Sequence, residues 1–151
     1  MIRLGSPADL VAVTDVYCRA SLSNPSDRDR LLAHPEYLVL GPEGLIEGRT
    51  YVAVENGSVV GFATWSHADG ATSQGAAELE DLFVDPAWTR RGIASALVNR
   101  VVEAVGANGA RNLEVTANSD ALPFYQAVGF IDSGIAETEA GSAPRMKLTL
   151  G

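Results

Sequence analysis

The sequence is poor in residues that bind metals or form disulfides: it contains one cysteine and two histidines among 151 residues. Cys18 has no partner for an intramolecular disulfide, and together with His34 and His67 it does not provide the spacing of a zinc site. We therefore expect no metal. The chain also has no run of about 18 apolar residues and no apolar leader after Met1. These absences predict a soluble, cytoplasmic protein that does not bind membranes.

Basic residues are also scarce, because 11 Lys and Arg stand against 19 Asp and Glu and give a formal net charge of -8. Such a surface repels phosphate backbones, which argues against nucleic-acid binding and favours cationic or neutral small partners. Any anion site must therefore be local, built from backbone amides and a few arginines. The sequence has no internal repeat and no linker-like stretch, so we expect residues 1–151 to form a single domain.

In the first half of the chain, the clearest signal is a hairpin. Asn56-Gly57 lies between the β-rich runs 50–55 and 58–65, and this dipeptide favours a tight turn between paired strands. Before it, the helical spacing of apolar residues predicts helices over 8–21 and 26–32. The connection over 37–44 is interpreted as irregular.

The second half alternates strand and helix patterns. The predicted elements are a strand at 78–84, a helix at 92–105, a strand at 111–117, a short helix at 120–128, and strands at 130–135 and 144–150. A strand, helix and strand of these lengths form a right-handed βαβ unit with parallel strands. The last two strands should pair antiparallel. The predicted fold class is therefore α/β, or α+β, with a mixed sheet.

The start of the predicted helix at 92–105 has the composition of an anion site. A helix N-terminus carries unpaired N–H groups and a positive dipole end, and Gly92 with the small Ala94 and Ser95 lets a phosphate approach. Arg90 and Arg91 add local positive charge. Taken alone, this pattern fits an ordinary turn with solvated arginines about as well. It is neither a Walker loop nor a dinucleotide fingerprint.

Two stretches resemble the GNAT superfamily of acyl-CoA-dependent N-acyltransferases. Thr89-Arg-Arg-Gly-Ile-Ala94 resembles its pyrophosphate loop, Gln/Arg-x-x-Gly-x-Gly/Ala, with Thr89 replacing the usual Gln or Arg. Asn118 to Phe130 resembles its next motif, an asparagine that closes a strand and a helix ending Phe/Tyr-Tyr-x-x-x-Gly-Phe. Together the two motifs are strongly specific. Residues 1–50 resemble the family only in pattern.

The resemblance implies a GNAT-like acyl-CoA N-acyltransferase fold, with central strands splayed around acetyl-CoA as co-substrate. The cofactor's pantetheine arm would pair with the main chain of the strand at 78–84, like an added strand. The residues implied to bind the cofactor are Leu82, Phe83, Val84, Arg90, Arg91, Gly92, Ile93, Ala94, Ser95, Asn118 and Phe124.

The resemblance also implies direct attack of an amine on the thioester, without a covalent enzyme intermediate. Tyr125 matches the tyrosine that protonates the departing sulfur, although a core aromatic would fit the same position. Glu80 matches the carboxylate that accepts the proton of the amine, and Asp81 and Glu78 compete with it for that role. These carboxylates are about equally well explained as solvated residues of a half-exposed strand.

We therefore predict an N-acetyltransferase that transfers an acetyl group from acetyl-CoA to a primary amine of a small molecule or peptide. The alternative is an acyl-CoA-binding sensor or regulatory subunit without turnover. Neither the acceptor, the acyl length nor the oligomeric state follows from the sequence, and a homodimer remains open. In this family the acceptor is chosen by the first helices and by the loop at 66–77. His67 is a minor candidate for the acceptor site, whereas Cys18 and His34 are expected to have no catalytic role.

Overall fold

The computed structural model describes residues 1–67, 75–138 and 141–150, so most of the predicted acceptor loop at 66–77 lies outside the described residues. The described strands are β1 (Ile2–Leu4), β2 (Thr50–Glu55), β3 (Ser58–His67), β4 (Ala76–Val84), β5 (Asn112–Thr116), β6 (Ile131–Thr138) and β7 (Gly141–Thr149). The described α-helices are α1 (Leu10–Leu22), α2 (Pro25–Ala33), α3 (Glu43–Ile46), α4 (Ile93–Ala107) and α5 (Leu122–Ala127).

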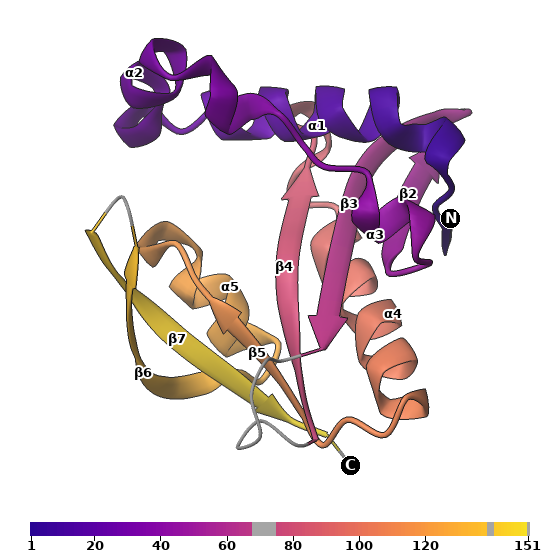
Figure 1. The fold of residues 1–151 in the computed structure, drawn as a ribbon, viewed down its shortest axis with the longest axis vertical. Helices are drawn as coiled ribbons and strands as arrows, with labels where there is room; N and C mark the ends of the chain where they lie inside the picture. The colour runs from indigo at the N-terminus through magenta and orange to yellow at the C-terminus, as the bar shows by residue number, and fades with distance from the viewer. Residues whose placement is uncertain (68–74, 139–140, 151) are drawn as a thin grey trace. The chain divides into compact units, whose positions relative to one another are not determined.

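The strands form a mixed sheet in the order β1-β2-β3-β4-β5-β7-β6 (Figure 1). Strand β4 pairs with β5 in parallel, from Ala76 opposite Asn112 to Glu78 opposite Glu114. The pairs β1–β2, β2–β3, β5–β7 and β6–β7 are antiparallel. The predicted mixed sheet, its parallel strand pair and its antiparallel C-terminal pair are therefore confirmed.

The hairpin predicted around Asn56-Gly57 is confirmed. Strands β2 and β3 pair from Glu55 opposite Ser58 to Thr50 opposite Thr64. Asn56 and Gly57 both have positive φ angles, 52° and 77°, as a tight turn between twisted strands requires.

The helices α1, α2, α4 and α5 begin and end within three residues of their predicted bounds. Two short elements in the first half were not predicted. Strand β1, with three residues, is too short for an alternating pattern to reveal it. Helix α3 occupies part of the connection interpreted as irregular. There Gly44 is buried and packs closely against Thr50, since a Cβ on it would lie 2.5 Å from Oγ1 of Thr50.

The contacts divide the chain into two compact units. Unit one contains Met1–Thr64 and Asp81–Val101, and unit two contains Trp65–Glu80 and Val102–Gly151. The single domain over 1–151 stays a prediction. No helix in the described part of the chain is both long and apolar enough to cross a lipid bilayer.

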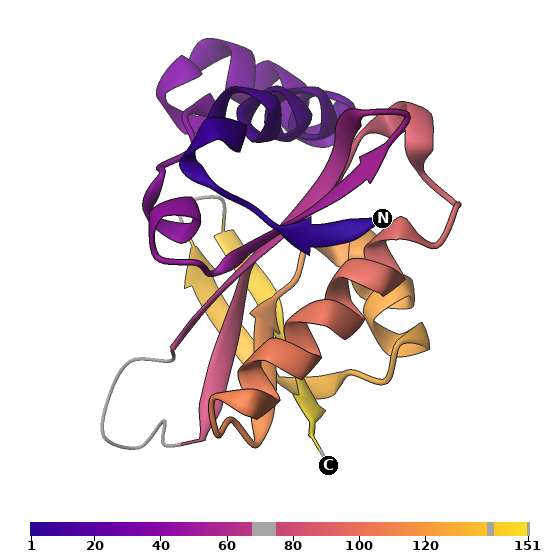
Figure 2. The ribbon, with the colours of Figure 1, turned by 90° about the vertical axis from the view of Figure 1, so that its right-hand side faces the viewer.

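In unit one, helices cover both faces of the β2–β3 hairpin (Figure 2). On one face, Val13 and Val16 of α1 are fully buried in a cluster with Val52 and Phe62. On the other face, Gly61 of β3 lets α4 approach closely, since a Cβ there would lie 3.3 Å from side chains of Ile93 and Leu97. This packing fixes the start of α4 relative to β3. The helix itself was predicted from the sequence, at 92–105.

In unit two, the core lies on one face of β5 and β7. Leu113 and Val115 of β5 are buried and stand opposite Leu148 and Met146 of β7. Tyr125 and Phe130 are also buried in this unit. The intervening residues of β5 are only partly buried, so the opposite face of these strands carries the polar side chains.

Candidate active site

The segment between β4 and α4 belongs to unit one and contains the predicted anion site. After Val84 the chain forms a 3-10 turn over Pro86–Trp88, and α4 begins at Ile93. Oδ1 of Asp85 accepts a hydrogen bond from the amide of Ala87 at 3.0 Å, which caps this turn. The strand therefore delivers a short, locally ordered loop to the helix N-terminus.

Two residues of this loop have left-handed backbones: Arg90 has a φ of 64° and Gly92 a φ of 80°. Glycine adopts this region without a steric cost, whereas it is uncommon for arginine. Alternation of left-handed and other backbone conformations can turn successive N–H groups toward one point, which makes a concavity for an anion. The glycine was predicted for close approach, but the conformation of Arg90 was not predicted.

No protein atom fills the space beside Gly92 at the start of the helix. A Cβ built on Gly92 would meet no atom within 4 Å, so a ligand has room where a side chain would otherwise stand. The carbonyl of Gly92 accepts the first helical bond, from the amide of Ala96 at 3.0 Å. The amides of Ile93, Ala94 and Ser95 precede this bond and therefore have no carbonyl within the helix to pair with. They carry the positive end of the helix dipole.

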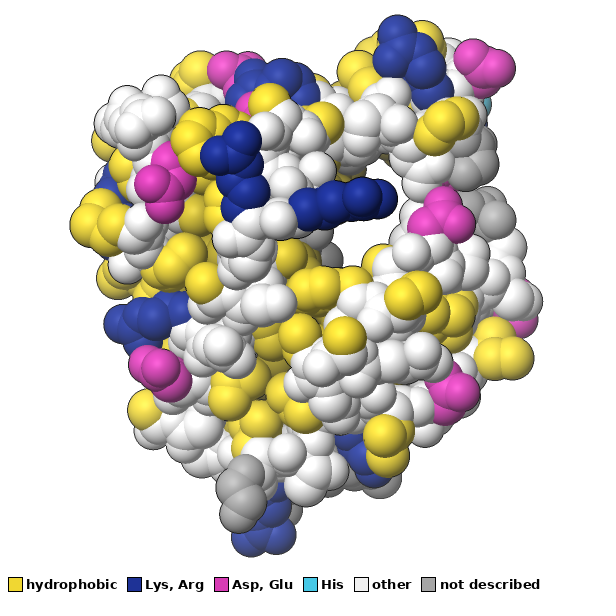
Figure 3. Space-filling model, turned by 180° about the vertical axis from the view of Figure 1, so that it is seen from behind, with side chains coloured by type: hydrophobic (Ala, Val, Ile, Leu, Met, Phe, Trp, Pro, Cys, Tyr) yellow, Lys and Arg dark blue, Asp and Glu magenta, His cyan; other side chains and the backbone are white. Residues whose placement is uncertain are grey.

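The loop carries positive charge, although the whole molecule is acidic. Arg90 and Arg91 are exposed, and the guanidinium carbon of Arg91 lies 4.7 Å from the centroid of the Trp88 ring. Acidic side chains are scattered over the face in Figure 3, with basic side chains among them. A net charge of -8 thus coexists with a local cationic loop, as the sequence required of any anion site.

The end of β4 that precedes this loop is only partly buried. Leu82, Phe83 and Val84 all have intermediate exposure. The Phe83 ring is stacked on Phe62 with centroids 5.6 Å apart, and it makes a T-shaped contact with the Tyr17 ring, with centroids 4.9 Å apart. The strand end is therefore fixed by aromatic packing in unit one. Main-chain pairing of the three residues with a pantetheine arm stays a prediction.

The second motif lies in unit two. The exposed Asn118 accepts a hydrogen bond at Oδ1 from the amide of Asp120, at 3.0 Å, and so caps the turn before α5. This role explains an asparagine after β5, and contact of Asn118 with a cofactor stays a prediction. Phe124 is half-buried, and its ring meets the edge of the Tyr125 ring at 5.2 Å.

Tyr125 is the most deeply buried of the predicted catalytic residues, with 7% of its surface exposed. Its ring makes edge contacts with the rings of Phe124 and Phe130, with centroids 5.2 Å apart in each pair. Burial raises the pKa of the Tyr125 phenol to about 12. The hydroxyl therefore stays protonated at neutral pH and is available as a hydrogen-bond or proton donor.

The three candidate carboxylates of β4 have different environments. Oε2 of Glu78 accepts a 2.6 Å hydrogen bond from Nη1 of Arg145, which pairs its charge. Glu80, also in unit two, is exposed. Asp81 belongs to unit one and is half-buried. Burial raises the pKa of Tyr17, and the negative charge of Asp81 raises it further, which places Asp81 close to α1.

The arginine that holds Glu78 was not predicted. Nη1 of Arg145 also donates to Oγ1 of Thr116 at 2.9 Å, and Nη2 donates to Glu114 at 3.3 Å. The hydrogen bond to Glu78, together with the negative charges of Glu78 and Glu114, raises the pKa of Arg145 above its already high usual value. The cluster lies on the partly buried polar face of unit two.

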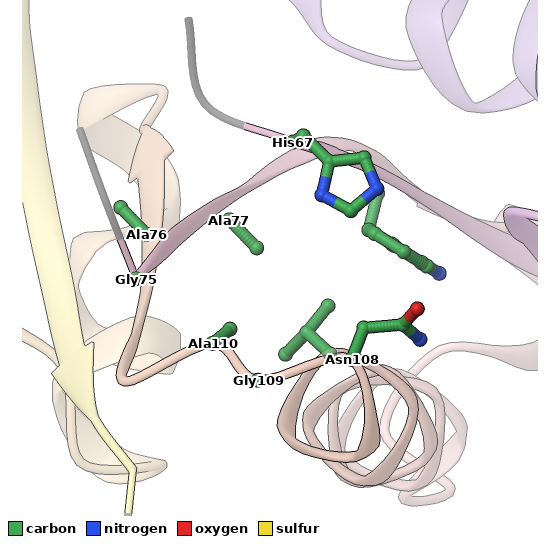
Figure 4. Close-up of a pocket in the computed structure, with 9 residues that line it drawn as sticks. His67, Gly75, Ala76, Ala77, Asn108, Gly109 and Ala110 are labelled. Atoms are coloured by element: carbon green, nitrogen blue, oxygen red, sulfur yellow. The ribbon is translucent and has the colours of Figure 1, made fainter. Parts of the chain in front are cut away.

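Cys18 and His34, which were expected to have no catalytic role, have contacts with other residues of the chain. Sγ of Cys18 donates to the carbonyl of Leu38 at 3.4 Å, and Nδ1 of His34 lies 3.0 Å from Glu36. His67 borders a hollow of about 80 Å³ in unit two, where it faces the chain that follows α4 (Figure 4). The hollow is lined by Trp65, His67, Gly75, Ala76, Ala77, Val105, Asn108, Gly109 and Ala110.

Each unit thus contains part of the predicted site. Unit one brings together the end of β4 and the loop that starts α4, which are the residues predicted for pantetheine and pyrophosphate. Unit two contains Glu80, Asn118, Phe124 and Tyr125.

Comparison with known proteins identifies the family of the chain. A family model described as the acetyltransferase (GNAT) family matches residues 15–130. An uncharacterized N-acetyltransferase of Methanocaldococcus jannaschii is 30% identical over 92 residues, which make up 58% of this chain and 41% of that protein. The chain spans less than half the length of the curated relatives that it matches.

Two solved structures are similar along the whole chain. An N-acetyltransferase from Staphylococcus aureus Mu50 has a TM-score of 0.74 and 26% identity, with 100% of this chain and 98% of that chain covered. The yncA protein of Salmonella typhimurium, solved with its cofactor acetyl-CoA, has a TM-score of 0.72 and 21% identity, with 100% and 94% covered. Since the family model covers most of the chain, the protein belongs to the acetyltransferase (GNAT) family.

Proposed function

We propose that this protein transfers an acetyl group from acetyl-CoA to a primary amine of a small molecule or peptide. The observation that carries the proposal is the loop before α4, where left-handed Arg90 and Gly92 flank Arg91 beside an open helix N-terminus. Pyrophosphate requires such a combination of backbone amides and positive charge. The acetyl-CoA found in the yncA structure, which shares this fold, supports the choice of cofactor.

The remaining cofactor contacts follow from the two motifs. The main chain of Leu82 to Val84 would pair with the amides of pantetheine, as in strand addition. Phe124 would supply an apolar contact beside this arm, and the NH₂ group of Asn118 would donate to it. The half-buried state of Phe124 and of the strand end supports this assignment, because a surface that binds a ligand remains partly accessible without it.

The proposed reaction is a direct displacement. The acceptor nitrogen attacks the thioester carbonyl carbon, so that an N–C bond forms and the C–S bond breaks. Glu80 takes a proton from the ammonium group before the attack and passes it to solvent, and the nitrogen loses a second proton to solvent as the amide forms. Tyr125 gives its phenolic proton to the departing thiolate and recovers one from solvent, so that one proton is released overall. The exposure of Glu80 and the ion pair of Glu78 with Arg145 favour Glu80 over Glu78 as base. Asp81 is the remaining alternative.

The acidic composition fits a cationic acceptor. A typical aliphatic amine is protonated at pH 7, so the site must attract a cation and then remove its proton before the attack. Carboxylates on β4 can serve both purposes. The acceptor is therefore proposed to be a primary amine that carries a positive charge in solution.

Two measurements test the proposal. Calorimetry should give saturable, one-to-one binding of acetyl-CoA, weakened by salt because the cofactor is a polyanion. A screen of small amines and of peptides with free N-termini, read by release of the CoA thiol, should then identify an acceptor. Absence of acetyl-CoA binding would refute the proposal. Tight binding without thiol release for every amine would favour the acyl-CoA sensor.

A further inference from the structure

The aromatic ring of Trp88 lies directly before the anion loop and has no role in the function proposed above. The guanidinium carbon of Arg91 lies 4.7 Å from the centroid of this ring, within the range of a cation–π interaction. Trp88 is half-buried, whereas Arg91 is exposed. The ring is thus the more fixed member of the pair, and the long arginine side chain lies on it.

The backbone that carries Trp88 is held by several hydrogen bonds within unit one. The amide of Trp88 donates to the carbonyl of Asp85 at 2.8 Å, and Oδ1 of Asp85 accepts from Ala87 at 3.0 Å. Oδ2 of the same carboxylate accepts from Nε of Arg19 on α1 at 2.9 Å. Both oxygens of Asp85 are therefore engaged, and they connect the turn to the first helix. An indole on such a turn has little freedom to move.

Stacking on an indole does not use the hydrogen-bonding groups of a guanidinium. A guanidinium stacked on a ring contacts it through its flat face, and its five N–H donors then point outward in the plane of the group. Arg91 can therefore remain on Trp88 and still donate to an anion at the loop. A free arginine side chain would lose rotamer freedom of about 2 kcal/mol on binding, and a stacked one has already lost part of it.

We propose that Trp88 is a positioning residue for the cofactor: its indole holds the guanidinium of Arg91 at the anion loop before the pyrophosphate arrives. This inference rests on the function proposed above, since it assumes that the anion is the pyrophosphate of acetyl-CoA. Trp88 would then affect the affinity for acetyl-CoA only through Arg91.

The test is a double-mutant cycle on acetyl-CoA binding, measured by calorimetry. Trp88→Leu keeps apolar bulk on the turn but removes the π face, whereas Trp88→Phe keeps a smaller face. We expect Trp88→Leu to weaken binding about two- to fivefold, the range of an exposed cation–π contact, and Trp88→Phe to weaken it less. In an Arg91→Ala background, Trp88→Leu should have no further effect.

The outcomes separate this inference from the function on which it rests. If wild-type protein does not bind acetyl-CoA, the proposed function fails and the role of Trp88 fails with it. If wild-type protein binds but Trp88→Leu has the same effect with and without Arg91, Trp88 acts on the fold of the turn, and the positioning role is wrong. Equal affinities of wild type and Trp88→Leu would also overturn it. Thermal unfolding of each variant establishes that the folded protein was measured.

Discussion

Nη1 of Arg145 lies 2.6 Å from Oε2 of Glu78, although 67 residues separate them in the sequence. Glu80 is two residues further along β4 and is exposed. Since residues two apart on a strand point to the same face, the two carboxylates share a face but have different environments. Glu78 is held by the guanidinium of Arg145, and Glu80 is exposed at the surface.

This difference predicts different pH profiles for two matched variants. Glu80→Gln should lower turnover about 100-fold near pH 7, a typical loss for a general base. Part of the rate should return at high pH, where the amine arrives already deprotonated. Glu78→Gln, which keeps the shape and an acceptor oxygen, should retain the wild-type profile.

The measurement is rate against pH at saturating acetyl-CoA, with an acceptor from the amine screen. Superimposable profiles for wild type and Glu80→Gln would exclude Glu80 and direct attention to Asp81, where the same substitution can be made as Asp81→Asn. A profile altered only by Glu78→Gln would contradict the assignment drawn from the Arg145 ion pair.

Tyr125→Phe separates a proton donor from a core aromatic. The variant keeps the ring and its contacts with Phe124 and Phe130 but lacks the hydroxyl. If Tyr125 protonates the thiolate, kcat should fall at least about tenfold while the Kd for acetyl-CoA changes little, because the proton is needed only in the transition state. Single-turnover kinetics and calorimetry measure the two quantities. An unchanged rate in a step limited by chemistry would leave Tyr125 as a packing residue.

The buried phenol also predicts a pH dependence of stability. The pKa of Tyr125 is about 12 in the folded protein against a usual value of 10.0, so between these values the folded state binds more protons than the unfolded state. Stability should therefore fall as pH rises from about 10 to 12, by about 2–3 kcal/mol in total. Below pH 10, Tyr125 contributes no pH dependence to the stability.

Phenolate absorbance provides the measurement, because the chain has four tyrosines. One of them should titrate near pH 12, and this component should disappear in Tyr125→Phe. A Tyr125 phenol that titrates near pH 10 would contradict the desolvation argument. Urea unfolding of both proteins across the same pH range checks the predicted sign.

Gly92 has a matched control elsewhere in unit one. Gly92 and Gly48 have similar φ angles, 80° and 74°, and a Cβ on either would meet no atom within 4 Å. Valine at either position should destabilise the fold by about 1–2 kcal/mol, since a left-handed backbone is strained for a branched residue. Only Gly92→Val should also abolish acetyl-CoA binding, because its side chain occupies the space for phosphate.

Calorimetry on the folded variants measures their affinity for acetyl-CoA, and unfolding experiments measure their stability separately. Undiminished affinity in Gly92→Val would remove the anion site from the start of α4. Equal losses of affinity in Gly92→Val and Gly48→Val would attribute the effect to strain rather than to the site.

Much of the fold was predictable because its signals are local. The turn at Asn56-Gly57 depends on the φ preferences of two adjacent residues, and the helix predicted at 92–105 depends on a period of 3.6 residues. The short elements β1 and α3 were not predicted, because neither is long enough to show a periodic pattern of apolar residues. Their formation depends on pairing with β2 in the first case and on close packing of Gly44 against Thr50 in the second.

For the site, the sequence alone determined which residue types stand at the start of α4 and in the helix around Tyr125, and these motifs led to the family. Only the tertiary structure decided the state of those residues. Arg145 reaches Glu78 because β7 pairs with β5 and β5 pairs with β4, each in one register. The pKa of Tyr125 follows from its burial in the core of unit two. Register and burial are set by contacts between distant segments, which no local pattern of residues encodes.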